Sequence, residues 1–384
     1  MVFPAQQPAV TPPRVRGGCL RAGRHRRPGS DDCRAPEAGA EEPHQSHPAP
    51  LVQRVSLLTP RAGGAGAGAA GGARQGVNSR QAPRTGRGRT AAILSLLLSA
   101  AELAGDPLRI ATWNVANYGP TGRVTAAGYR SDYPKPEAEK AALRAALHRL
   151  DADVLALQEM GPPAYLEELA RDLAREGLHY PYRAIAGDGE PRRNALLSRR
   201  PLHAVQTHLD LEFPYLGQPT RLRRGLLEAT LSTPGGEITL VVLHLKSPLS
   251  DDPRDPRADA LRRAEAGAVR ARLRERFPDP RGARFLLLGD CNEAPAGPAV
   301  QTLRRRGRTE LLRLAPATDD RGDSWTHHYR RGETYTRVDL ILYSPATAPW
   351  IAGPGVIVDG PDVRQASDHR PVVIALDPGP VNGG

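Results

Sequence analysis

Several short apolar runs in this sequence border polar residues whose side chains suit phosphate chemistry. Four runs end at such residues, and two others begin at or just after them. Carboxylates, amides and imidazoles are the groups that metal-assisted hydrolysis of a phosphoester requires. Any one of these residues alone has a structural explanation, such as a turn after a strand, so the hypothesis depends on their joint placement. The residues are Asn114, Glu159, His244, Asp290 with Asn292, Asp339, and Asp368 with His369.

The elements that would position these residues are short strands with helices between some of them. The apolar runs fit strands, for example over residues 154–157, 238–245 and 285–289. Helical periodicity covers three segments, residues 137–150, 165–176 and 258–277. Because strands and helices do not alternate strictly, the pattern favours a layered α/β sandwich over a parallel, doubly wound sheet.

The direction of the strands decides whether the polar residues meet. Asp339 and Asp368-His369 stand at the start of their apolar runs. The other polar residues stand at the end of theirs. If the former strands lie antiparallel to the latter, all six places come together at one edge of the sheets. The sequence therefore predicts a cluster of carboxylates, amides and imidazoles at that edge.

The same residues lie in seven short motifs that resemble those of the endonuclease/exonuclease/phosphatase superfamily, in the superfamily's order. The resemblance covers residues 112–369 and implies an α/β fold of four layers, with two packed mixed or antiparallel sheets flanked by helices. It also implies a metal-dependent phosphoric ester hydrolase. The motifs are Thr112-Trp113-Asn114, Gln158-Glu159, Asn194 to Ser198, His244-Leu245, Gly289 to Asn292, Arg337-Val338-Asp339 and Ser367-Asp368-His369.

The resemblance implies a role for each residue around a divalent cation. Glu159 is expected to be the principal ligand of Mg²⁺, or of Mn²⁺, because such ions prefer oxygen ligands. Asn114 and Asp368 are expected to support the metal site directly or through water. Asp290 is expected to orient or deprotonate the attacking water.

The remaining polar residues are expected to contact the phosphate. By the same resemblance, Asn292 and His244 donate hydrogen bonds to phosphate oxygens. His369 also faces the phosphate, while Asp339 orients the imidazole and favours its charged form. Asn194 and Arg224 are candidates for substrate binding.

One position departs from the superfamily pattern. Cys291 stands where a bulky apolar residue is common, and the side chain after Asp290 is expected to point into the packing rather than act as a reactive thiol.

The substrate has to be inferred from the loops. The predicted domain has several basic clusters that could follow a nucleic-acid backbone or could simply be solvated faces. Aromatic side chains that could stack on bases are few: Tyr118, Tyr129, Tyr133 and Tyr215. We favour a nuclease acting on DNA or RNA. The alternatives are a phosphatase or phosphodiesterase acting on a small or lipid-linked phosphoester and, less favoured because Glu159 and both histidines are retained, an inactive phosphate-binding module. The clusters are Arg192-Arg193, Arg221 with Arg223-Arg224, Arg304 to Arg306 with Arg308, and Arg330-Arg331.

Composition separates the N-terminal part of the 384-residue chain from the rest. Residues 1–104 carry +8 of the net charge of +11 and are rich in Gly, Ala, Pro and Arg. Such a segment cannot bury enough apolar surface to offset the entropy of ordering it, so residues 1–90 are predicted to be disordered. The catalytic domain is predicted over residues 105–384. Because most of the net positive charge lies before this domain, the net charge of the whole chain indicates little about what the domain binds.

A signal-like segment precedes the predicted domain. Over residues 84–104, arginines are followed by a short apolar run and small residues, which is typical of a signal peptide, although its position is unusual. The alternative is an amphipathic helix that leads into the domain. The run is too short to span a membrane as an ordinary helix. Localisation would be secreted or periplasmic if the segment is a signal peptide and cytoplasmic otherwise. The sequence implies no protein partner.

Overall fold

A computed structural model describes residues 106–187 and 190–379. The predicted disordered region and the signal-like segment lie outside the described residues. Two sheets form the centre of the domain, with seven and six strands. In sheet order, the first contains β16 (Ala317–Thr318), β20 (Gly355–Ile357), β21 (Val372–Leu376), β1 (Leu108–Tyr118), β4 (Val154–Met160), β6 (Arg193–Ser198) and β5 (Tyr182–Ile185). The second contains β15 (Arg313–Leu314), β19 (Asp339–Tyr343), β12 (Phe285–Asp290), β11 (Gly236–His244), β10 (Leu226–Thr233) and β7 (His203–His208).

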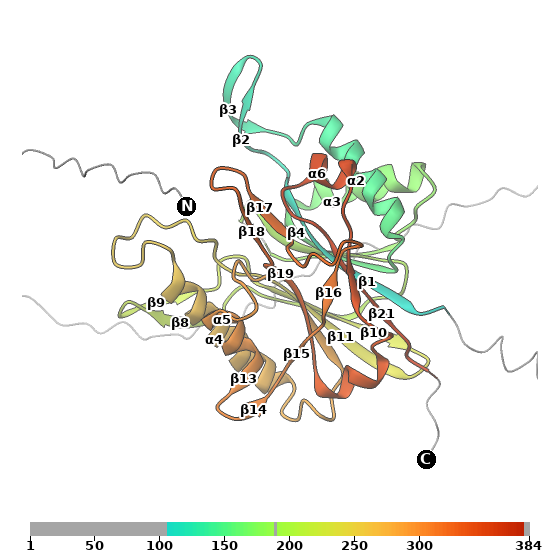
Figure 1. The fold of residues 1–384 in the computed structure, drawn as a ribbon, viewed down its shortest axis with the longest axis vertical. Helices are drawn as coiled ribbons and strands as arrows, with labels where there is room; N and C mark the ends of the chain where they lie inside the picture. The colour runs from blue at the N-terminus through green and yellow to red at the C-terminus, as the bar shows by residue number, and fades with distance from the viewer. Residues whose placement is uncertain (1–105, 188–189, 380–384) are drawn as a thin grey trace, which may run out of the picture. The chain divides into compact units, whose positions relative to one another are not determined.

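Helices cover the outer face of each sheet, so the domain has four layers (Figure 1). α2 (Glu137–Leu150), α3 (Pro163–Arg175) and α6 (Pro361–Ala366) pack on the seven-stranded sheet. α4 (Asp259–Arg276) and α5 (Pro298–Arg304) pack on the six-stranded sheet, and the short helix η1 spans Pro345–Trp350. The predicted four-layered sandwich is confirmed. Within the described part of the chain, no helix is long and apolar enough to cross a membrane.

Alternation along the strands divides the core into two outer clusters and one between the sheets. In β4, Leu155 and Leu157 face α2 and α3, whereas Val154 and Ala156 face the other sheet. Successive side chains of a strand point to opposite faces, so a continuous apolar run serves two core layers at once. This explains why the runs read as uniformly apolar in the sequence. Cys291 is buried in the cluster under α4 and α5, as predicted.

Strand direction brings the polar ends together. β1 is parallel to β4, and β11 is parallel to β12. β21 runs antiparallel to β1, and β19 runs antiparallel to β12. His244, Asp290 and Asp339 are direct neighbours across three adjacent strands. The condition set from the sequence is therefore met, and the polar residues share one edge of the two sheets.

Gly289 lies where β12 passes closest to β11. Its φ of 139° is one that residues with a side chain rarely adopt. A Cβ at this position would lie 2.0 Å from the carbonyl oxygen of Leu243, which is paired with it across the two strands. The glycine before Asp290 is thus required by the close approach of two backbones.

We expect Gly289→Ala to lower the free energy of unfolding by at least about 2 kcal/mol, because backbone atoms inside a sheet cannot move aside cheaply. The matched control is Gly267→Ala in α4, where a Cβ would meet no atom within 4 Å. That substitution should stabilise the protein slightly through helix propensity. Thermal unfolding followed by circular dichroism measures both, and an unchanged melting temperature for Gly289→Ala would contradict the argument.

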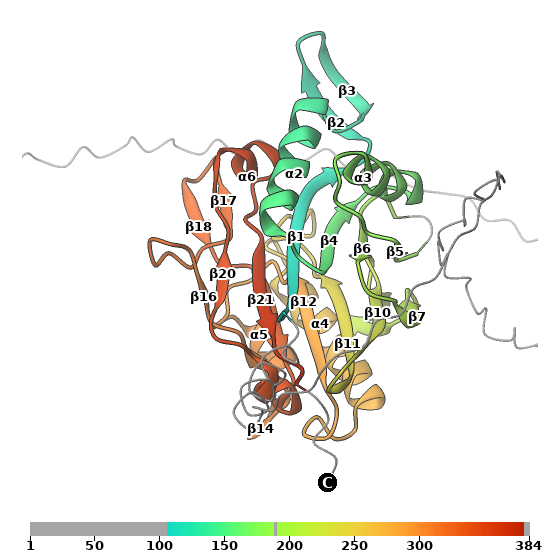
Figure 2. The ribbon, with the colours of Figure 1, turned by 90° about the vertical axis from the view of Figure 1, so that its right-hand side faces the viewer.

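Several small hairpins were not predicted from the sequence, because their strands are short and, apart from β8 with its buried Phe213, have no buried apolar side chain. They are β2 (Thr121–Thr125) with β3 (Gly128–Tyr133), β8 (Glu212–Tyr215) with β9 (Gln218–Arg221), β13 (Arg305–Arg306) with β14 (Thr309–Glu310), and β17 (His327–Tyr329) with β18 (Thr334–Thr336). The β2–β3 hairpin projects from the domain beyond α2 (Figure 2). Tyr129 and Tyr133 are exposed on it. Tyr118 is fully buried at the end of β1, so its predicted availability for base stacking is wrong.

Candidate active site

Glu159 lies near the end of β4 in the left-handed backbone conformation, with φ of 64°. For a residue other than glycine, this conformation costs about 1 kcal/mol or more. The register of β4 shifts at this point against both of its neighbours, β1 and β6. The Oε2 atom accepts a hydrogen bond of 3.0 Å from the backbone N–H of Asn117, which is itself left-handed at φ 57°. The two irregular strand ends therefore hold this carboxylate in place.

Asp290 is the centre of the cluster. Its Oδ2 atom accepts a hydrogen bond of 3.0 Å from Nδ2 of Asn114, which joins the ends of the two sheets. The Nε2 atom of His244 lies 3.4 Å from the same oxygen and 4.0 Å from Oε1 of Glu159. The Nε2 atom of His369 lies 4.0 Å from Oδ2. Asp290 itself is almost fully buried.

Asn292 follows Asp290 in a left-handed turn, with φ of 50°. Its backbone N–H donates to Oδ1 of Asp290 at 2.7 Å. Its side-chain Nδ2 donates to the carbonyl oxygen of Leu245 at 2.9 Å and lies 3.3 Å from Oδ2 of Asp290. The side-chain amide of Asn292 therefore orients the Asp290 carboxylate in this structure. To donate to a phosphate oxygen, Nδ2 would have to give up its longer hydrogen bond, the one of 3.3 Å to Asp290.

His369 is held from both sides. Its Nδ1–H donates to Oδ2 of Asp339 at 2.7 Å, and Oγ of Ser367 accepts its backbone N–H at 3.0 Å. The indole N–H of Trp113 donates to the carbonyl oxygen of His369 at 2.9 Å. Because Asp339 occupies Nδ1, the Nε2 atom is the one directed at Asp290 and at an incoming substrate.

Burial and neighbouring charges set the protonation states. Burial disfavours the imidazolium of His369, but the Asp339 carboxylate, helped by Asp290, outweighs burial and raises the pKa of His369 to about 10. Burial, opposed by the charge of His369 and reinforced by that of Asp339, raises the pKa of Asp290 to about 6. Burial, together with the charges of Arg224 and His369, lowers the pKa of His244 well below its usual value. At neutral pH the cluster thus holds a charged His369, a neutral His244 and an ionised Asp290.

The geometry agrees with a match between this sequence and a known family. The model of the Endonuclease/Exonuclease/phosphatase family matches residues 111–369, which include every site residue described above. The chain belongs to this family. Members of the family are hydrolases that act on phosphoester bonds, and this activity class applies to the chain.

Several solved structures are similar to this chain, and the two with a TM-score of 0.50 have a similar fold. Sphingomyelinase C from Streptomyces griseocarneus is 18% identical, with a TM-score of 0.50 over 71% of this chain and 99% of that chain. Beta toxin from Staphylococcus aureus is 14% identical, with a TM-score of 0.50 over 70% and 99%. The catalytic domain of human Nocturnin is 17% identical, with a TM-score of 0.47 over 71% and 96%. A search of curated proteins finds no match.

The donor set around Glu159 fits the divalent cation that the family implies. Oε2 of Glu159 is fixed by Asn117, while Oε1 accepts no hydrogen bond from the described residues and lies 4.0 Å from Nε2 of His244, which leaves Oε1 available as a ligand. Mg²⁺ commonly uses one or two carboxylates and fills the rest of its shell with water and substrate oxygens. Oδ1 of Asn114 accepts the N–H of Ala116, so it would support the cation with its second lone pair or through water.

Two clusters in the described residues bring three candidate ligand atoms within 4.8 Å of one another. One combines Asp290, Asp339 and His369, where the imidazolium already supplies positive charge between two carboxylates. The other combines Asp368, His369 and His327. Nearby protein atoms partly desolvate the Asp368 carboxyl, whose side chain is still 47% exposed, and favour its neutral form, but the neighbouring His327 and His369 hold its pKa well below the usual range. Asp368 therefore stays ionised, as a supporting ligand requires.

The two candidate substrate residues lie on the His244 side of the cluster. Arg224 donates to the carbonyl oxygen of Leu245 at 2.6 Å, next to His244, and its charge acts on Glu159 and Asp290. Asn194 is fully buried, and its Nδ2 donates to the carbonyl oxygen of Gly225 at 3.1 Å. Its Oδ1 has no hydrogen-bond partner among the described residues.

Sequence reasoning missed three residues that complete the site. Asn117 binds Glu159 through its backbone, and its Oδ1 accepts a 2.6 Å hydrogen bond from Arg192, which lies 3.9 Å from Glu159. The ring of His327 lies 4.5 Å from that of His369. Arg192 was noted only as part of a basic cluster, and no periodic pattern marked Asn117 or His327, because both follow from strand irregularity and hairpin pairing.

We expect Asp339→Asn to abolish the raised pKa of His369, because the carboxylate that opposes burial is lost while burial remains. The imidazole should then titrate near or below pH 6.5, the ordinary value for histidine. A raised histidine pKa stabilises the fold below about pH 6.5, and that stabilisation is lost as pH rises through about 10. The variant should therefore be less stable than wild type at pH 6, and the difference should shrink towards pH 10. Histidine ¹⁵N chemical shifts and thermal unfolding measure both; a His369 that still titrates near pH 10 would contradict the assignment.

Proposed function

We propose that the protein is a divalent-metal-dependent nuclease that hydrolyses nucleic-acid phosphodiesters by an activated water. The observation that carries the hydrolytic part is the convergence on Asp290 of Asn114, His244 and His369, with Asn292 fixing its orientation. A buried carboxylate with a pKa of about 6 is matched to taking a proton at neutral pH. Asn114, Asn292 and His244 would keep it aimed at the water.

The other residues would stabilise the charge that develops on the phosphate. His369, kept protonated by Asp339, would donate from Nε2 to a phosphoryl oxygen, and Arg224 would contribute positive charge near Glu159 and Asp290. When bound at Glu159, a cation would neutralise charge on the phosphoryl and leaving oxygens. Asp368 and Asn114 would support it.

Basic residues around the site support nucleic acid as the substrate. Arg192 and Arg224 flank Glu159, while Arg330 and Arg331 lie near Asp368 at the other side. Guanidinium groups on both sides of a phosphodiester site suit a strand that continues in both directions.

A lipid-linked phosphoester is the second candidate, and one observation favours it. The side chains of Val124 and Tyr129 on the projecting β2–β3 hairpin are 86% and 70% exposed. Apolar and aromatic side chains on a projection near the site could enter a membrane interface. The retained charged cluster argues against an inactive phosphate-binding module.

The test is a hydrolysis panel with the full chain at fixed Mg²⁺, with EDTA as the metal-free arm. Substrates are plasmid DNA, abasic DNA, single-stranded RNA, inositol phosphates, phospholipid vesicles and a chromogenic phosphodiester. We expect cleavage of nucleic acid that EDTA abolishes. Hydrolysis restricted to vesicles or inositol phosphates would overturn the nucleic-acid assignment, and no hydrolysis of any substrate would favour the inactive module. Cleavage that persists in EDTA would overturn metal dependence.

A further inference from the structure

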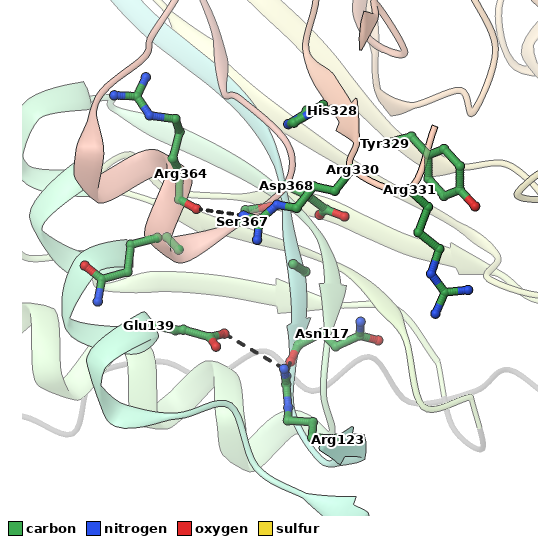
Figure 3. Close-up of a pocket in the computed structure, with 13 residues that line it drawn as sticks. Asn117, Arg123, Glu139, His328, Tyr329, Arg330, Arg331, Arg364, Ser367 and Asp368 are labelled. Atoms are coloured by element: carbon green, nitrogen blue, oxygen red, sulfur yellow. Dashed lines mark hydrogen bonds and ion pairs between the residues drawn. The ribbon is translucent and has the colours of Figure 1, made fainter. Parts of the chain in front are cut away.

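A basic cleft opens beside the catalytic cluster, on the side of Asp368 (Figure 3). It has a volume of about 390 Å³, which is in the range of small-molecule sites. Its lining comes from five separate segments: the end of β1, the β2–β3 hairpin, the start of α2, the β17–β18 hairpin and α6 with the residues that follow it. The charged residues of its lining are Arg123, Glu139, Arg330, Arg331, Arg364 and Asp368.

The β17–β18 hairpin is attached directly to the catalytic segment. The backbone N–H of His328 donates to the carbonyl oxygen of Asp368 at 3.1 Å, and His327 pairs with His369 as an isolated antiparallel bridge. Arg330 and Arg331 follow at the turn of this hairpin, only a few residues away. Their distance from the reacting groups is therefore set by backbone pairing.

The buried Arg370 fixes the start of the same hairpin through two contacts. Arg370, which follows His369, is 1% exposed and stacks on the Trp325 ring with its guanidinium carbon 3.4 Å from the ring centroid. It also forms an ion pair of 2.8 Å with the buried Asp319. These contacts hold the entry to β17 against the segment that carries His369.

Two arginines of the cleft, Arg330 and Arg331, have positive charge to offer a ligand. Arg330 donates to the backbone carbonyl oxygen of Arg364 at 3.4 Å, and neither Arg330 nor Arg331 forms an ion pair with any residue that the structure describes. Arg123, on the opposite wall, is already engaged: it forms an ion pair of 3.9 Å with Glu139 and donates to the carbonyl oxygen of Asn117 at 2.8 Å, although its Nε atom has no hydrogen-bond partner among the described residues (Figure 3). The guanidinium of Arg364 differs, because it pairs with Asp359 at 2.7 Å and points away from the others (Figure 3).

We propose that this cleft binds a second phosphate of the substrate, the one next to the scissile phosphate on the same nucleic-acid strand. The proposal rests on the nuclease function proposed above and deepens it. Arg330 and Arg331 on one wall form an anion site beside Asp368, and they face the Arg123–Glu139 ion pair on the other wall. A substrate with only the scissile phosphate would leave this anion site empty. The enzyme should therefore prefer substrates that carry a phosphate beside the bond it cleaves.

The kinetic test compares two thymidine dinucleotides. TpT has only the scissile phosphate, whereas pTpTp carries a phosphate on each side of it. We expect wild type to prefer pTpTp in kcat/KM by about tenfold or more, because a charge-assisted hydrogen bond to a guanidinium is strong. Arg330→Ala combined with Arg331→Ala should remove this preference and leave the rate on TpT unchanged.

The matched control is Arg306→Ala combined with Arg308→Ala. These exposed arginines belong to the β13–β14 hairpin, far from the β2–β3 hairpin in Figure 1, and the variant loses the same charge. It should keep the preference for pTpTp. Equal loss in both variants would mean that only the overall charge matters and would overturn the proposal, as would a wild type that cleaves both dinucleotides equally well.

Binding in EDTA separates the failure of this proposal from the failure of the proposed function. Fluorescence anisotropy with fluorescein-labelled oligothymidylate reports affinity without cleavage. The Arg330 and Arg331 double variant should bind several-fold more weakly, and its dependence on salt should be shallower by roughly 0.7 per lost phosphate contact. If the double variant binds more weakly but wild type cleaves no nucleic acid, the nuclease function is overturned and the anion site is still supported. If the double variant binds oligothymidylate as tightly as wild type, the anion site is overturned, whatever the cleavage assays show.

Discussion

Glu159→Gln should reduce the rate of phosphodiester hydrolysis by orders of magnitude at ordinary Mg²⁺ and recover part of it at high Mg²⁺ or Mn²⁺. The substitution keeps the size of the side chain and the hydrogen bond from Asn117, but it removes the charge from the oxygen available to a cation. Metal affinity should fall, and a weakened site can still be filled by mass action. The measurement is a metal titration of the hydrolysis rate for wild type and variant.

The control for this titration is Glu237→Gln. Glu237 is an exposed carboxylate at the start of β11, at the end of the strand remote from His244. Its variant should have wild-type rate and metal dependence. If Glu159→Gln also kept both, the assignment of the metal site to this carboxylate would be wrong.

His369→Ala should lower the rate by about a hundredfold to a thousandfold, as expected when a donor to a developing oxyanion is removed. Unlike the Glu159 variant, it should not be rescued by added metal, because Glu159 and Asn117 are untouched. The loss should appear in kcat more than in KM, since the imidazolium acts mainly on charge that develops in the transition state. The same metal titration measures both effects.

His203→Ala is the control for the histidine variant. His203 is half exposed on β7 and pairs with Glu237, away from the catalytic edge, so its removal should leave the rate unchanged. Rescue of His369→Ala by metal would contradict the division of roles between carboxylate and imidazole, even if the family membership stands.

The sequence predicted the catalytic edge because the information is local there. His244, Asp290 and Asp339 each adjoin an apolar run, and pairing of the three strands aligns them automatically. The helix over Glu137–Leu150 was also predicted, because its buried leucines recur at helical spacing. Features of this kind depend on patterns that short windows of sequence contain.

Other parts of the site depend on contacts that no local pattern encodes. The conformation of Glu159 arises from register shifts against two neighbouring strands, and Asn117 reaches the carboxylate through a backbone N–H that any residue type could supply. The β17–β18 hairpin has no apolar alternation, and its position follows from backbone bonds to Asp368 and His369. Tyr118 shows the reverse error: an aromatic residue near a strand end was taken as exposed, although α3 covers it and Glu168 accepts its hydroxyl.

The left-handed conformations of Asn117, Glu159 and Asn292 place the stability of this protein in conflict with its chemistry. At each of the three positions glycine would adopt the same backbone without strain, so selection for thermal robustness alone would drift towards glycine. Glycine at these positions would remove the carboxylate of Glu159, which can hold a cation, and the side-chain amide of Asn117, which binds Arg192. It would also remove the side-chain amide of Asn292, which orients Asp290. A thermostabilised form obtained by relaxing unfavourable backbone angles would therefore be a well-folded protein with an eroded catalytic centre.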